Sequence, residues 1–182
     1  MRLLGAILAG GQATRFGSDK ALAMLGERSL IEHAAAALAD VVEGTIVCGR
    51  EVAPLGLIAI RDTPAPGLGP LGGLCAALRY AADHDYHAVL SIGCDTPSLP
   101  RVLIDRLVAG RRARFLRQAP IIGCWCSDLA DVLATHLARG GDRSVQRWAT
   151  SAGVEPIDAG GDLPNINRAS DLARLAAGHA AL

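Results

Sequence analysis

The chain has 182 residues, a length that suits one domain with a sizeable hydrophobic core. Its 18 basic and 18 acidic residues cancel, so it lacks the basic field that nucleic acids and membrane surfaces require. Aromatic residues make up only 3% of the sequence, which argues against stacking platforms for single-stranded nucleic acid. We therefore expect neither a nucleic acid nor a membrane as a partner.

The cysteines and the N-terminus indicate the compartment. Five cysteines with scattered spacing do not suggest a disulfide framework, and we expect them to be buried thiols. The apolar run at residues 3–8 is at or below the short limit for a signal peptide, and no later run is long enough to span a membrane. We expect this run to be the first buried strand and the protein to be cytoplasmic.

Apolar strands alternate with amphipathic helices along most of the chain, which is the pattern of a parallel α/β sheet. Ser29 and Glu32 have capping-box spacing and predict a helix that ends near Asp40. Later, Pro100 is placed to begin a helix and Ser127 to cap another. After residues 3–8, the expected strands are 44–48, 57–61, 87–93, 113–118, 120–124 and 154–159. The other expected helices are 71–82, 100–110, 127–140, a short one ending at 153, and one that begins at Ser170.

The first strand runs directly into a loop rich in glycine and basic residues, with the spacing Leu-Ala-Gly-Gly-x-x-x-Arg-Phe-Gly-x-x-Lys over residues 8–20. Gly10 and Gly11 let the backbone turn sharply and let amide groups approach an anion. Arg15 and Lys20 add two cations, so the loop is suited to hold a nucleoside triphosphate. The spacing differs from a Walker A loop and from Gly-x-Gly-x-x-Gly. The alternative is a glycine-rich hairpin with two solvated cations.

Two later carboxylates end apolar strands. Asp95 follows the strand at 87–93 and should face the same crevice as the glycine loop, because ligands of open α/β sheets bind at the carboxyl ends of strands. Its carboxylate could hold a Mg²⁺ that bridges phosphate oxygens or could cap the turn at Thr96, and the two roles are compatible. Asp62 ends another strand, and Gly-Pro-Leu-Gly-Gly at 69–73 then opens a helix. These small residues could face the base or ribose of a ligand, or could serve only to pack the helix on the sheet.

Taken together, these motifs resemble those of the molybdenum cofactor guanylyltransferases, a family of nucleotidyltransferases. The loop, the Asp62 strand end, Gly-Pro-Leu-Gly-Gly, Cys-Asp-Thr-Pro and Asn165-Ile166-Asn167 occur in the family's order and cover nearly the whole chain. The resemblance implies a Rossmann-like α/β fold with a mostly parallel central sheet and helices on both faces. We expect a single nucleotidyltransferase domain over residues 1–182, whose N-terminal half binds GTP and whose C-terminal half binds the acceptor. One departure is Cys48-Gly49, where the family often carries Asn.

The reaction implied by the resemblance is transfer of GMP from GTP to the terminal phosphate of molybdenum-molybdopterin cofactor, with release of pyrophosphate. Mg²⁺ is the implied cofactor. Cofactor-inserting proteins and target molybdoenzymes are further expected partners. The alternatives are a cytidylyl or sugar-phosphate nucleotidyltransferase, and a non-catalytic nucleotide-binding protein of the same fold.

Individual residues receive roles on the same basis. The expected catalytic residues are Arg15, Lys20 and Asp95, and Asp95 is also the expected metal ligand. The expected nucleotide-binding residues are Leu8, Ala9, Gly10, Gly11, Lys20, Asp62, Gly72 and Asp95, with Gly10 leaving room for a purine. Arg143, Asn165 and Asn167 are placed in the second half of the chain and could bind the acceptor through anion and amide contacts. The alternative is that residues 141–144 form only an interhelical turn.

Overall fold

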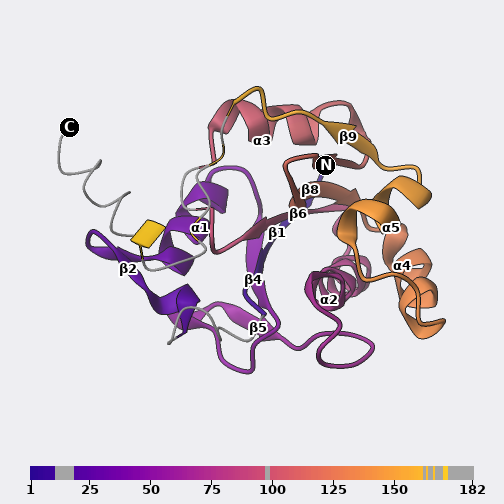
Figure 1. Cartoon of the computed structure of the whole chain (residues 1–182), viewed down its shortest axis with the longest axis horizontal. Helices are drawn as coiled ribbons and strands as arrows, with labels where there is room; N and C mark the ends of the chain where they lie inside the picture. Colours follow the sequence, from indigo (N-terminus) through magenta and orange to yellow (C-terminus); the bar gives the residue numbers. More distant parts are fainter. Residues whose placement is uncertain (11–18, 97–98, 162, 164–165, 167–169, 172–182) are drawn as a thin grey trace.

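The computed structural model describes residues 1–10, 19–96, 99–161, 163, 166 and 170–171. A seven-stranded sheet forms the centre of the molecule, with the strand order β5-β4-β1-β6-β8-β7-β9 (Figure 1). Its strands are β1 (Leu3–Leu8), β4 (Gly44–Cys48), β5 (Ile58–Ile60), β6 (Ala88–Gly93), β7 (Arg114–Leu116), β8 (Ala119–Cys126) and β9 (Glu155–Ile157). A separate two-stranded hairpin consists of β2 (Met24–Leu25) and β3 (Arg28–Ser29).

The sheet is mostly parallel. Strands β5, β4, β1 and β6 run in parallel, β8 is antiparallel to both β6 and β7, and β9 pairs in parallel with β7. Every residue of β1 and β6 is buried, which explains why the two strands read as unbroken apolar runs. The expected fold class is confirmed, and the strands predicted near 113–118 and 120–124 form the antiparallel pair of β7 and β8.

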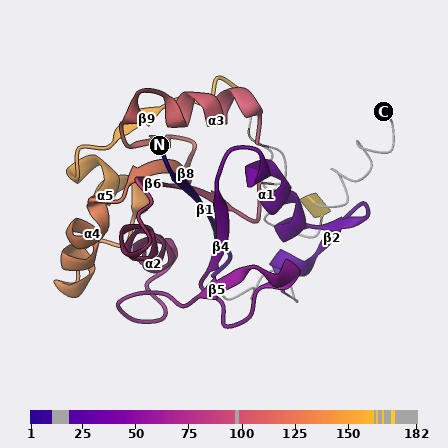
Figure 2. The same cartoon turned by 180° about the vertical axis from the view of Figure 1, so that it is seen from behind.

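Helices cover both faces of the sheet (Figures 1 and 2). On one face lie α1 (Leu30–Ala39) and α3 (Arg101–Val108), and on the other lie α2 (Pro70–Asp83), α4 (Leu129–Ala138) and α5 (Val145–Ser151). Short 3-10 turns are η1 (Lys20–Leu22), η2 (Pro54–Gly56) and η3 (Ala109–Arg111). Within the described ranges, no helix combines the length and the apolar character needed to cross a membrane.

One predicted helix start is confirmed and another is wrong. The Glu32 carboxylate accepts from the backbone N–H and the hydroxyl of Ser29, both at 2.6 Å, and so forms the expected capping box of α1.

The N-cap of α4, however, is Asp128 and not Ser127. Strand β8 extends to Cys126, and the backbone N–H and hydroxyl of Ser127 donate to the carbonyl of His87 beside the start of β6. Ser127 therefore continues the strand pairing. The helix predicted from Ser170 lies almost entirely outside the described residues.

A buried serine connects the sheet to the aromatic side chains of the core. The Ser91 hydroxyl donates to the carbonyl of Ile121 at 2.6 Å and accepts from the indole Nε1–H of Trp125 at 2.7 Å. Trp125 packs against Phe115 and Trp148, with ring centroids 6.2 Å and 5.7 Å away. Ser91 thus satisfies an indole donor that would otherwise be buried without a partner.

Replacing Ser91 with alanine should lower the free energy of unfolding by about 1–3 kcal/mol, because the Trp125 indole loses its acceptor inside the core. Urea denaturation measures this change. The matched control is Thr150→Ala, which removes an exposed hydroxyl that donates to the Gln146 carbonyl at 2.9 Å. The control should stay within about 0.5 kcal/mol of the wild type. Equal effects of the two substitutions would contradict the structural importance of the Ser91 contact.

Candidate active site

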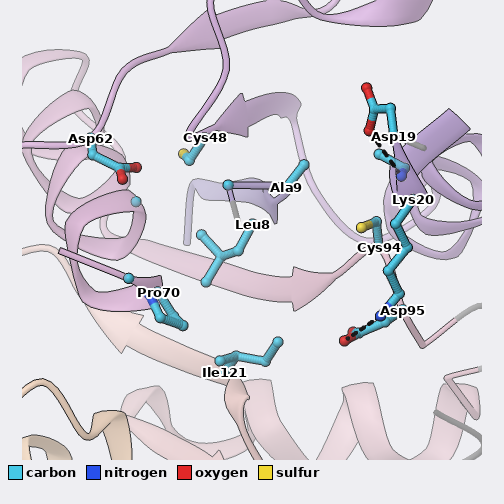
Figure 3. A pocket seen from close by; sticks show the side chains of 14 residues that line it. Leu8, Ala9, Asp19, Lys20, Cys48, Asp62, Pro70, Cys94, Asp95 and Ile121 are labelled. Carbon is cyan, nitrogen blue, oxygen red and sulfur yellow. Dashed lines mark hydrogen bonds and ion pairs between the residues drawn. The ribbon is translucent and has the colours of Figure 1, made fainter. Parts of the chain in front are cut away.

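A cavity of about 240 Å³ lies at the carboxyl ends of the central parallel strands (Figure 3). Its lining includes residues 8–10 at the end of β1, Cys48 at the end of β4, and Cys94 and Asp95 just after β6. This is the edge at which open α/β sheets bind ligands, because the strands end there and the loops diverge. The cavity is therefore the candidate active site.

Lys20 and Asp95 meet on one side of this cavity (Figure 3). Lys20 is the first residue of η1, and its Nζ lies 3.3 Å from Oδ2 of Asp95. The two side chains are only 21% and 23% exposed, so the pair is partly shielded from water. The prediction that Asp95 faces the crevice beside the glycine loop agrees with this position.

The second carboxylate oxygen of Asp95, Oδ1, is buried and has no hydrogen-bond partner among the described residues. It lies where a side chain of residue 93 would begin: a Cβ on Gly93 would be 2.3 Å from this oxygen and 2.6 Å from Cδ1 of Ile121. Burying a charged oxygen without a partner is costly, and a nearby cation would offset that cost. Across the described residues, no group of three or more His, Cys, Asp or Glu side chains is placed to hold a metal. The buried Oδ1 of Asp95 is thus suited to hold a divalent cation through one carboxylate ligand.

Asp62 lies on the opposite side of the cavity from Lys20 and Asp95 (Figure 3). Its carboxylate is partly buried, and it has no hydrogen-bond or ion-pair partner within the described part of the chain. Burial raises the pKa of this carboxyl above its usual range. A half-desolvated carboxylate that faces a cavity without a partner is suited to accept hydrogen bonds from a ligand.

The small residues at the start of α2 line the cavity at some positions and allow close packing at others. Gly69, Pro70 and Gly73 line the cavity. Gly72 is not among the lining residues, but a Cβ at this position would lie 3.0 Å from the Cβ of Asp62, so a glycine lets Asp62 pack here. Sequence reasoning singled out Gly72 and missed Gly73, since two adjacent glycines give no local signal of which one faces a ligand.

Gly10 and Gly49 bring the ends of β1 and β4 into backbone contact. A Cβ on Gly10 would lie 3.0 Å from the Gly49 Cα, and a Cβ on Gly49 would lie 2.4 Å from the Gly10 Cα. Gly49 also has a φ of +82°, a left-handed conformation that favours glycine. Gly10 therefore has a packing reason to be glycine in addition to its expected role beside a purine. Where the family often carries Asn, this chain has Cys48-Gly49, and Gly49 allows the backbones at the ends of β1 and β4 to come into contact.

The structure brings six of the predicted residues around the cavity: Leu8, Ala9, Gly10, Lys20, Asp62 and Asp95. Arg143 lies on the exposed loop between α4 and α5, where its Nη1 donates to the carbonyl of Gly67 at 3.1 Å. It therefore contacts the loop that leads into α2 and not the cavity lining itself. Gly11, Arg15, Asn165 and Asn167 lie outside the described residues.

An ion pair that sequence reasoning missed lies next to Lys20. Arg50 follows β4 and makes two hydrogen bonds to Asp19, with Nη1 2.9 Å from Oδ1 and Nη2 in contact with Oδ2. Asp19 lines the cavity and caps η1 by accepting from the backbone N–H of Ala21 at 3.2 Å. The Arg50 guanidinium lowers the pKa of the Asp19 carboxyl, so the carboxyl remains ionised. The two partners are 31 residues apart, and no local pattern connects them.

Residues 5–154 match the family model of the MobA-like NTP transferase domain. The chain belongs to this family. It is a nucleotidyltransferase, and the family expected from the sequence motifs is confirmed. The chain is 36% identical over 189 residues to the molybdenum cofactor guanylyltransferase of Cereibacter sphaeroides, covering 96% of this chain and 95% of the relative. It is 35% identical over 182 residues to the protein of the same name from Rhodobacter capsulatus, with the same coverage.

A solved structure supports the fold independently. The molybdopterin-guanine dinucleotide biosynthesis protein A from Archaeoglobus fulgidus matches with a TM-score of 0.76 at 20% identity. The match covers 98% of this chain and 100% of that protein. The seven-stranded sheet with helices on both faces is thus a nucleotidyltransferase fold.

Four of the five cysteines, Cys48, Cys75, Cys94 and Cys124, are buried as expected, and Cys126 is partly exposed. Two of the buried thiols line the cavity. Burial, reinforced by nearby carboxylates, raises the pKa of Cys48 to about 12 and that of Cys94 to about 11. Both are therefore protonated and unreactive in the folded protein at neutral pH.

Cys48 and Cys94 should react with iodoacetamide at least about a hundredfold more slowly in the folded protein than in urea at about pH 8, because only the thiolate is nucleophilic. Mass spectrometry of tryptic peptides measures each cysteine separately. Comparable rates in the folded and unfolded states would show that these thiols are not shielded as the structure places them.

Proposed function

We propose that this nucleotidyltransferase transfers GMP from GTP to the terminal phosphate of molybdenum-molybdopterin cofactor and releases pyrophosphate. The observation that carries the proposal is the cavity with two chemically different sides: a Lys20–Asp95 pair on one and an unpartnered Asp62 on the other. A nucleoside triphosphate has the same division, with charged phosphates at one end and a hydrogen-bonding base at the other. The similarity over nearly the whole length to two molybdenum cofactor guanylyltransferases supports the choice of donor and acceptor.

The phosphate side supplies the electrostatics of the proposed reaction. An oxygen of the acceptor phosphate attacks the α-phosphorus of GTP, the bond from that phosphorus to the bridging oxygen breaks, and pyrophosphate leaves. No protein nucleophile is required, because such transfers depend on positioning and charge stabilisation. Lys20 offsets part of the negative charge, and Arg15, a second cation of the 8–20 motif, would stabilise the departing pyrophosphate. Mg²⁺, with Asp95 as its protein ligand, would neutralise further charge on the phosphates.

The side of the cavity that carries Asp62 is suited to recognise guanine through hydrogen bonds. Adjacent N1–H and N2–H groups on the guanine edge can both donate to one carboxylate, and Asp62 has both oxygens without a partner in the described structure. Cytosine and adenine place an acceptor beside their amino group, so they offer a carboxylate only one good donor and one repulsive contact. A site that leaves a buried polar group unpaired with the wrong base discriminates strongly against it.

The acceptor is proposed to bind through the C-terminal half of the single domain. Arg143 lies beside the loop that leads into α2, and the N-cap and first residue of that helix, Gly69 and Pro70, line the cavity. Asn165 and Asn167 are assigned to the acceptor because each amide carries a donor and an acceptor for a polar heterocycle such as a pterin. We propose that the reaction takes place in the cytoplasm and that the product passes to cofactor-inserting proteins and target molybdoenzymes.

The deciding experiment measures pyrophosphate release from GTP, CTP and ATP in the presence of Mg²⁺, with and without molybdenum cofactor. We expect release from GTP that depends on the cofactor, together with a guanine dinucleotide product seen by mass spectrometry. Preference for CTP would instead indicate a cytidylyltransferase. Release driven by a sugar 1-phosphate would indicate a sugar-nucleotide enzyme, and nucleotide binding without turnover would indicate a non-catalytic protein.

Asp95→Asn should reduce kcat by at least about a hundredfold, because it removes a charge at the reacting phosphates while it keeps the shape of the side chain. The melting temperature should not fall, since the substituted carboxylate has a buried oxygen without a partner. Steady-state kinetics and thermal unfolding measure the two effects. Asp105→Asn, on the exposed face of α3 and paired with Arg101 at 2.8 Å, is the matched control and should leave kcat unchanged. Near-normal turnover of Asp95→Asn in Mg²⁺ would rule out the metal role.

Asp62→Asn should exchange base preference. Affinity for GTP should fall by about tenfold or more, because the amide cannot accept from both guanine donors, while affinity for XTP should rise, because its C2 carbonyl accepts from the amide N–H. Calorimetric titration with both nucleotides measures the change. If Asp62 holds the ribose hydroxyls instead, GTP and XTP will weaken together, and the assignment to the base will be wrong.

A further inference from the structure

We propose that Arg50 enables triphosphate binding by acting through Asp19, whose negative charge it cancels on the phosphate side of the cavity. Arg50 is thus a positioning residue for the nucleotide, which it does not itself need to touch. The inference rests on the proposed function, since it concerns the charge that faces GTP.

Arg50 and Asp19 form a bidentate ion pair. Both terminal nitrogens of the Arg50 guanidinium contact the two oxygens of Asp19, the fork-to-fork arrangement that gives the strongest charge-assisted hydrogen bonds. The Arg50 side chain is only 19% exposed. Its backbone follows directly on Gly49, whose N–H donates to the carbonyl of Ile60 at 2.8 Å. The guanidinium therefore extends from a well-held point at the end of β4.

Among the described residues on this side of the cavity, the charges balance only if Arg50 is included. Lys20 is positive, and Asp95 and Asp19 are negative, and all three line the cavity. Arg50 brings the sum of these four groups to zero, and without it an uncompensated carboxylate would face the incoming triphosphate. Like charges in a partly desolvated site repel strongly, so Asp19 without its partner would weaken binding of the anionic nucleotide.

Asp19 also has a structural role, as the N-cap of η1. Its Oδ1 caps η1, the turn that presents Lys20, by accepting from the Ala21 N–H. An asparagine retains this acceptor oxygen and is an equally good N-cap, but it carries no charge. Asp19→Asn therefore separates the capping role from the electrostatic one.

The test measures Mg²⁺-dependent GTP binding by calorimetry, together with kcat and KM, for single and double variants. Arg50→Ala should weaken GTP binding by about tenfold, the order expected for exposing one charge to a phosphate group. Adding Asp19→Asn to this variant should restore affinity to within about threefold of the wild type, because no net charge remains. Asp19→Asn alone should bind GTP at least as tightly as the wild type. Arg50→Lys, which keeps the charge but loses the fork, should fall between the wild type and Arg50→Ala.

The matched control is Arg61→Ala. Arg61 forms an exposed ion pair with Glu51 at 2.9 Å, with side chains 78% and 76% exposed, so its removal changes net charge equally without touching the cavity. GTP binding by Arg61→Ala should equal that of the wild type.

Three outcomes would overturn the inference. The first is an Arg50→Ala variant that binds GTP like the Arg61→Ala control. The second is a double variant that binds as weakly as Arg50→Ala, which would reduce Arg50 to a purely structural support. The third is weakened binding by Asp19→Asn alone, a result that decides the matter even if Arg50→Ala does not fold. A wild-type protein that does not bind GTP would instead refute the proposed function.

Discussion

The parallel pairing of β1 with both β4 and β6 is the constraint on which the site depends. Leu8 pairs with Cys48 on one side and with Gly93 on the other, so three strands end at the same level. Each strand is buried among its neighbours, and a register slip of one residue would turn apolar side chains to the wrong face. The segments that follow these ends are therefore brought together whatever their separation along the chain.

The close spacing of strands at the carboxyl edge of the sheet explains why glycines occur there. Neighbouring strands lie about 4.8 Å apart, so side chains beyond their ends compete for little space. Gly10 and Gly49 let two backbones touch, and Gly93 leaves the space that a carboxylate oxygen of Asp95 occupies. Gly72 and Gly73 allow Asp62 to lie against the start of α2 in a similar way. The absence of side chains at these positions places two acidic groups on the cavity wall, where water solvates them poorly.

Asp95 and Asp62 lie in different electrostatic environments because different charged groups surround them. Asp95 shares the phosphate side with Lys20, and the Arg50–Asp19 pair lies next to them. Asp62 has no such neighbour, and burial raises its pKa. A chain whose formal charges cancel overall can still have different electrostatic potentials on the two sides of one cavity, because the arrangement of a few desolvated groups decides the local field.

The sequence by itself determined the elements whose signals are local. The unbroken apolar runs of β1 and β6, the capping box at Ser29 and the order of the glycine and aspartate motifs were enough to predict the fold class, the family and the position of Asp95 at the crevice beside the glycine loop. Tertiary structure alone decided the contacts that depend on strand length and register. The extension of β8 moved the α4 cap from Ser127 to Asp128, and helix phase turned Gly73 rather than Gly72 to the cavity. The partnership of Arg50 with Asp19 likewise exists only because β1 and β4 end side by side, and residue types along a single chain do not encode which distant side chain will lie within reach.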